Sequence, residues 1–141
     1  MKLSALWLVV LLFCISCAGE NPSHENLNEK IEYLIDDHRY EVALEELEDE
    51  DIDDPAIREL LEKTHLNYGL YNMNTFDERE MRTRMNDALR QFTEVLQINP
   101  RNEVARTNID QILQIYSTIP DRQPEEDVVE RLREVGINPG S

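Results

Sequence analysis

The chain has 141 residues, of which 30 are acidic and 14 basic, giving a formal net charge of −16. So acidic a surface repels phosphate backbones, and the sequence has no basic stripe or aromatic platform, which excludes nucleic-acid binding as an expected function. The length suits one domain with enough chain to bury a hydrophobic core.

The chain begins with a short targeting pattern. Met1 and Lys2 precede an apolar run over residues 3–15, and small residues follow it. About thirteen residues rising ~1.5 Å each are too short to cross a hydrocarbon core about 30 Å thick. A positive start, an apolar run and a small-residue exit are typical of a secretory signal.

The only two cysteines lie at the end of this run. Cys14-Ile15-Ser16-Cys17 resembles a bacterial lipobox, although Cys14 stands where that motif usually has an aliphatic residue. The resemblance implies a signal peptide over residues 1–16 and attachment of diacylglycerol to Cys17. A redox pair is the alternative given by the Cys-x-x-Cys spacing, but the apolar surroundings would not lower a thiol pKa. An ordinary secretory signal is the other alternative.

Residues 17–25 lack periodicity and predict a tether. Ala18 and Gly19 follow Cys17, with no aspartate of the kind associated with inner-membrane retention, so the lipoprotein resemblance implies the periplasmic face of the outer membrane. No polybasic segment is present for anionic lipid, so membrane residence would depend on the acyl chains.

Beyond the tether the apolar residues recur at helical spacing, without the alternation of strands. Six helices are therefore expected, with apolar faces over residues 27–35, 40–47, 57–68, 81–96, 105–116 and 128–135. The acidic run 48–54, which is followed by Pro55, should form a loop because its like charges repel.

Further residues predict where helices begin and end. Asn72 to Thr75 should end the third helix, and Thr75 with Glu78 has the pattern of a capping box for the fourth. Pro124 favours the start of the sixth helix, and Gly136 favours its end.

Two stretches share one pattern. Ala43-Leu44 and Ala88-Leu89 are each followed by a large apolar residue four positions after the alanine and by a proline twelve positions after it. A small residue lets two helices approach closely, and the large one fills the space beside it. The residues expected to pack such hairpins are Tyr40, Ala43, Leu47, Pro55, Tyr68, Ala88, Phe92 and Pro100.

This pattern resembles the tetratricopeptide repeat over about residues 27–116, although the two alanines are 45 residues apart instead of the family's 34. The family also has a small residue in the middle of each first helix, where this chain offers Ile31 and His65. The resemblance implies an all-α fold of stacked antiparallel helical hairpins over residues 26–141, with about two repeats and C-terminal capping helices. It also implies a partner groove, with Glu32, Ile35, Glu62, Leu66, Thr107 and Gln111 as candidate residues.

Catalytic and metal motifs are weak. The run 45–54 holds eight acids in ten residues, but a calcium loop would need a glycine where Asp54 stands and a glutamate where Leu60 stands. Glu62-x-x-His65 has the spacing of one half of a di-iron site, and no second copy exists. No nucleophile elbow or phosphate-binding loop is present, so neither an enzyme nor a cofactor or metal is expected.

The expected function is that of a lipid-anchored scaffold or adaptor that binds a protein or peptide at the bacterial cell envelope. The groove residues suit a peptide with one basic and one apolar anchor. A self-associating structural envelope protein and a weak acidic cation-binding protein are the alternatives. The sequence leaves the partner's identity and the oligomeric state open.

Overall fold

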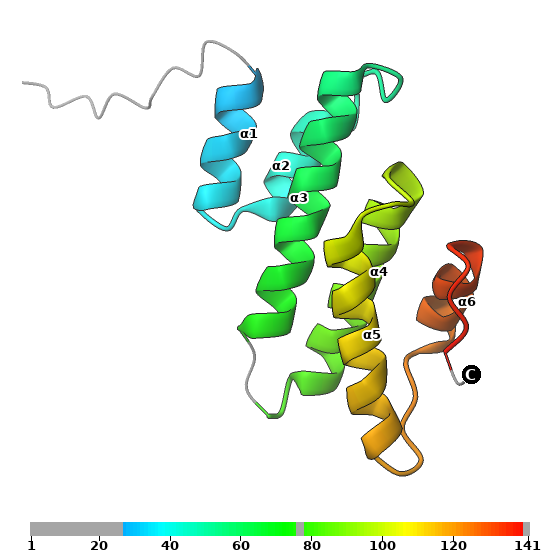
Figure 1. The fold of residues 1–141 in the computed structure, drawn as a ribbon. Coiled ribbons are helices and arrows are strands. Elements are labelled where there is room, and N and C mark those ends of the chain that lie inside the picture. Colours follow the sequence, from blue (N-terminus) through cyan, green and yellow to red (C-terminus); the bar gives the residue numbers. More distant parts are fainter. Residues whose placement is uncertain (1–26, 76–77, 140–141) are drawn as a thin grey trace, which may run out of the picture.

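The computed structural model describes residues 27–75 and 78–139, and the predicted signal peptide, Cys17 and the predicted tether lie outside them. The described residues form six α-helices and no strand (Figure 1), so the prediction of an all-α fold is confirmed. The helices are α1 (Leu27–Asp36), α2 (Tyr40–Leu47), α3 (Pro55–Asn74), α4 (Met81–Ile98), α5 (Glu103–Thr118) and α6 (Glu126–Glu134). None of these helices is both long and apolar enough to span a membrane.

The longest helix, α3, joins the two halves of the molecule. It packs most extensively on α4, and it also contacts α1 and α2. On the other side α4 packs on α5 and α6 (Figure 1). Helix α3 therefore lies between an N-terminal pair of helices, α1 and α2, and a C-terminal group, α4 to α6.

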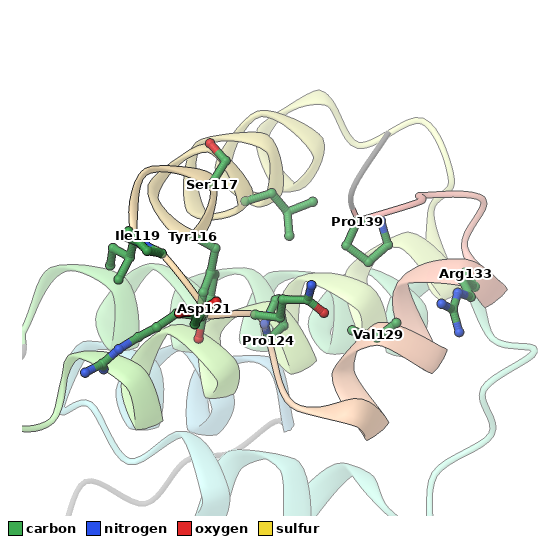
Figure 2. Close-up of a pocket in the computed structure, with 12 residues that line it drawn as sticks. Tyr116, Ser117, Ile119, Asp121, Pro124, Val129, Arg133 and Pro139 are labelled. Atoms are coloured by element: carbon green, nitrogen blue, oxygen red, sulfur yellow. The ribbon is translucent and has the colours of Figure 1, made fainter.

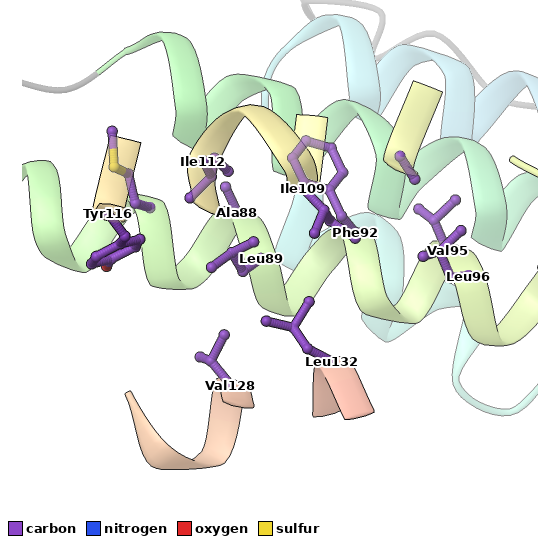
Figure 3. Close-up of a cluster of buried hydrophobic side chains, with 12 residues drawn as sticks. Ala88, Leu89, Phe92, Val95, Leu96, Ile109, Ile112, Tyr116, Val128 and Leu132 are labelled. Atoms are coloured by element: carbon purple, nitrogen blue, oxygen red, sulfur yellow. The ribbon is translucent and has the colours of Figure 1, made fainter. Parts of the chain in front are cut away.

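The buried apolar residues form two clusters, one toward each of these two sets of helices. The first core comprises Ile31, Leu34, Ile35, Tyr40, Ala43, Leu47, Ile57 and Leu60. The second comprises Met85, Ala88, Leu89, Phe92, Val95, Leu96, Ala105, Ile109, Ile112, Tyr116, Val128 and Leu132 (Figure 3). Both follow from apolar residues repeating every three or four positions, which places them on one face of each helix.

The acidic segment between α2 and α3 is a loop, as expected from its repulsive charges. The loop ends at Asp54, whose side chain accepts the N–H of Ala56 at 2.8 Å, and Pro55 takes the first position of α3. Proline is favoured there because its missing N–H would have no partner in the helix. Two independent local signals thus set the start of α3.

The predicted capping box at Thr75 is wrong. The Thr75 hydroxyl donates to the carbonyl of Tyr71 at 2.6 Å and so closes the last turn of α3. Helix α4 begins only at Met81, after Glu80, whose side chain makes no capping hydrogen bond. The predicted break at residues 72–75 is confirmed, because α3 ends at Asn74 and the N–H of Thr75 donates to the carbonyl of Tyr71 at 3.0 Å. Asn72 itself is buried within the helix, and its side-chain oxygen accepts a hydrogen bond from Arg84 of α4 at 2.9 Å.

Two helices end through residues with positive φ. Gly136, at φ +79°, follows α6, and the N–H of Ile137 then donates to Leu132 at 2.8 Å, which confirms the predicted stop. His38, at φ +58°, follows α1 in the same way, and the N–H of Arg39 donates to the carbonyl of Leu34 at 2.8 Å. This 6→1 bond satisfies a carbonyl that the helix leaves unpaired.

A close approach fixes the distance between α3 and α4. A Cβ added to Gly69, in the second half of α3, would lie 2.6 Å from Cε1 of Phe92. The Phe92 ring is fully buried in the second core. The ring therefore packs directly against the backbone of α3, in space that any side chain at position 69 would occupy.

Candidate functional site

Two hollows meet on the exposed face of α3. One, of ≈ 420 Å³, lies between the start of α3 and the α4–α5 turn and is lined by residues that include Arg58, Glu59 and Glu62. The other, of ≈ 460 Å³, is lined by Glu59, Glu62, Lys63 and Leu66. Because Glu59 and Glu62 line both, we treat the five residues as one continuous surface, the α3 strip.

The helical repeat explains the composition of the α3 strip. Its members are spaced by three and four residues, which brings them to one face of the helix. The opposite face carries Ile57, Leu60 and Thr64, all buried. Burial of that face against α1, α2 and α4 leaves the polar face of α3 to solvent, with Leu66 at its edge packing partly against the second core.

The structure brings some of the predicted groove residues together. Glu62 and Leu66 line the α3 strip, and Glu32 of α1 forms an ion pair with Lys63 of the strip. Thr107 and Gln111 are exposed on α5 but line neither hollow. Ile35 belongs to the first core and is only 5 % exposed, so its side chain faces the protein interior.

Glu62 holds the α4–α5 turn against α3. The side-chain amides of Asn99 and Asn102 donate to its Oε1 at 2.9 and 2.7 Å. Asn102 in turn caps α5, because its oxygen accepts the N–H of Ala105 at 2.8 Å. This carboxylate therefore positions the start of α5 through two hydrogen bonds to its Oε1 atom.

Glu59 is the other carboxylate of the strip. It makes no hydrogen bond or ion pair with the part of the chain that the structure describes. Its neighbour Arg58 is engaged, since it donates to the carbonyl of Ile98 at 2.9 Å, and Lys63 is held by Glu32. Glu59 was not among the groove residues predicted from the sequence, although its position three residues before Glu62 places it on the same helix face.

Aromatic side chains gather where α2 meets α3. The rings of Tyr40 and Tyr68 stack with centroids 5.0 Å apart, and Tyr71 lies 5.5 Å from Tyr40. The Tyr68 hydroxyl donates to the carboxylate of Glu41, and burial with this bond raises the pKa of Tyr68 above its usual value. These rings therefore join α2 to α3.

The motifs with metal-binding spacing are not assembled into a metal centre. Across residues 27–75 and 78–139, no three His, Cys, Asp or Glu side chains are placed to hold a metal ion. The ring of His65 makes a hydrogen bond at 2.8 Å with Gln91, while Glu62 binds the two asparagines of the α4–α5 turn. The two members of the Glu62-x-x-His65 motif thus have different structural partners.

Comparison with known proteins supplies no relative: no family model, curated protein or solved structure matches the chain. What can be said of its function therefore depends on the α3 strip and on the sequence motifs.

Proposed function

We propose that the protein is a lipid-anchored adaptor, in which stacked helical hairpins similar to tetratricopeptide repeats bind another protein at the bacterial cell envelope. The diacylglycerol would be carried by Cys17, and the tether would hold the stack at the periplasmic face of the outer membrane. Binding of this kind requires neither catalysis nor a cofactor.

The observation that carries the proposal is the α3 strip. It combines a free carboxylate at Glu59, an aliphatic side chain at Leu66 and two adjoining hollows on a rigid helix. A preformed, partly apolar concavity with few polar groups is the usual form of a recognition site. The two anchors are seven residues apart, so they lie ~10 Å from each other along the helix axis.

This spacing indicates the chemistry of the partner. A lysine or arginine of the partner would pair with Glu59, and an apolar side chain would cover Leu66. In an extended peptide these two residues would be about three positions apart, at ~3.3 Å per residue. The strongly acidic chain, at −16, favours a basic partner and speeds its approach.

The likeness to a hairpin repeat is supported by Gly69. The family places a small residue of the first helix against the second, and Ile31 and His65 are poor candidates for that place. Gly69 meets this requirement one helical turn after His65, because it lies against the large Phe92 ring of the next helix. The α1–α2 and α3–α4 pairs would then be the two repeats, with α5 and α6 as capping helices.

Site-specific crosslinking tests the binding surface. A photoreactive residue in place of Glu59, in the full chain produced in its own cells, is expected to capture a partner protein. The matched control replaces Glu130 of α6, another exposed helical glutamate with no ion pair among the described residues. Adducts from position 59 alone would support the proposal, whereas no adduct there, or the same adducts from both positions, would refute it.

A further inference from the structure

A third hollow lies at the other end of the C-terminal group, bounded by the end of α5, the α5–α6 loop and α6 (Figure 2). Its volume is ≈ 340 Å³. Its apolar lining is provided by Leu113, Tyr116, Ile119, Pro120, Pro124, Val129 and Pro139. The prolines restrict the backbone around it, so the hollow is largely preformed.

Two arginines border this apolar hollow, Arg122 in the α5–α6 loop and Arg133 in the last turn of α6. Within the described residues neither side chain makes an ion pair or hydrogen bond, whereas Arg90 and Arg131 of the same region are both paired with carboxylates. Among the residues that the structure describes, Asp121 is the one carboxylate that lines the hollow. An apolar hollow with two unpaired cations suits an apolar side chain flanked by carboxylates.

Such a group is present in this chain. The α2–α3 loop carries Ile52, which is 57 % exposed, between Asp51 and Asp53. The N–H of Asp53 donates to the Asp51 side chain at 3.0 Å, and this bond holds the three residues in a local turn. Large apolar side chains so exposed are few in the described chain, the others being Tyr33 and Val104.

The loop cannot reach the hollow of its own molecule. The α2–α3 loop and the α5–α6 loop lie at opposite ends of the stack (Figure 1). A contact between them must therefore join two molecules.

We propose that the α5–α6 hollow binds the α2–α3 loop of a second copy of this chain, with Ile52 in the hollow and its flanking aspartates beside Arg122 and Arg133. The two surfaces are unlike each other and lie at opposite ends, so the contact is head-to-tail. Such contacts do not close on themselves at two copies and can add further molecules in a row. The inference is independent of the α3 strip, which stays exposed in such a row.

Complementary variants test this contact. The hollow variant, Arg122→Glu with Arg133→Glu, keeps an intact loop, and the loop variant, Ile52→Asn, keeps an intact hollow. Sedimentation of the full chain in detergent, at physiological ionic strength and rising micromolar concentration, should show wild-type species larger than dimers. Each variant alone should remain monomeric, and an equimolar mixture should form dimers and nothing larger.

The matched controls are Arg39→Glu and Val104→Asn, which change an exposed arginine and an exposed valine elsewhere and should associate like the wild type. All variants share residues 1–26, so association through that segment would be the same in each. The proposal is overturned if the wild type stays monomeric, if either variant alone associates like the wild type, or if the mixture contains only monomers.

Discussion

Replacing Gly69 with alanine is expected to lower the free energy of unfolding by about 2 kcal/mol, although alanine is the better helix former by about 1 kcal/mol. The new methyl group would lie 2.6, 2.8 and 3.0 Å from three atoms of the Phe92 ring. That ring is fully buried, so it cannot move without disturbing the second core. The steric cost therefore exceeds the gain in helix propensity. Thermal unfolding should show a fall in Tm of roughly 8 °C.

The double variant Gly69→Ala with Phe92→Leu separates this explanation from a general intolerance of α3. Phe92→Leu alone should destabilise because it leaves a cavity against Gly69. In the double variant the added methyl group fills part of that space, so the two losses should be clearly less than additive. Strict additivity, or a stabilising Gly69→Ala substitution, would contradict the close approach of α3 and α4.

Replacing Arg90 with methionine is expected to release α6 from α4, at a cost of about 2 kcal/mol. The guanidinium donates to Asp127 at 2.8 and 3.1 Å, to Glu125 at 2.6 Å and to Asp87 at 2.8 Å. Its loss leaves three carboxylates close together without their cation. The Arg90 side chain is only 28 % exposed. The expected loss of stability therefore lies between the cost of breaking an exposed ion pair and the cost of breaking a buried one.

Hydrogen exchange locates this effect. Amide protection should fall over α6 (Glu126–Glu134) in the Arg90→Met protein while α1 and α2, which pack on the far side of α3, keep theirs. Arg131→Met is the matched control, since Arg131 has the single ion pair with Glu94 and should have a smaller effect. An equal loss of amide protection in α6 and in α1 and α2 of the Arg90→Met protein would contradict the separate attachment of α6.

The same cluster makes the docking of α6 sensitive to acid. Hydrogen bonding from Arg90 lowers the pKa of Asp127 below its usual value. A carboxyl whose pKa is lower in the folded state adds stability above its unfolded pKa, about 3.9, and that stability is lost as the pH falls through the lowered value. Acid should therefore expose α6 in the wild type, and the Arg90→Met protein should lose this part of the pH dependence.

The six helices were predictable because their apolar residues repeat every three or four positions, and this signal depends on the local sequence alone. The acidic loop and the stop at Gly136 follow from charge repulsion and backbone geometry, which are also local. The capping box failed because the Thr75 hydroxyl can serve either the helix before it or the helix after it. It bonds to Tyr71, four residues back, a competing option that the sequence pattern does not exclude.

The candidate site was less predictable because it depends on contacts between distant residues. The two amides that engage Glu62 come from positions 99 and 102, and no spacing rule connects them with α3. Ile35 lies only three positions after Glu32, yet its side chain is buried in the first core. Gly69 carries a signal that the sequence does offer, since an isolated glycine inside a helical pattern usually has a packing reason, but its neighbour Phe92 is found only in the fold.

The proposed function depends most on attachment of the stack to a membrane through Cys17. The direct measurement is the mass of the N-terminal peptide of the protein extracted from cell membranes. The account predicts that this peptide begins at Cys17 and carries a diacylglyceryl group, and that the Cys17→Ser protein lacks it. A peptide that begins at any other residue, or one that begins at an unmodified Cys17, would contradict a lipid-anchored adaptor.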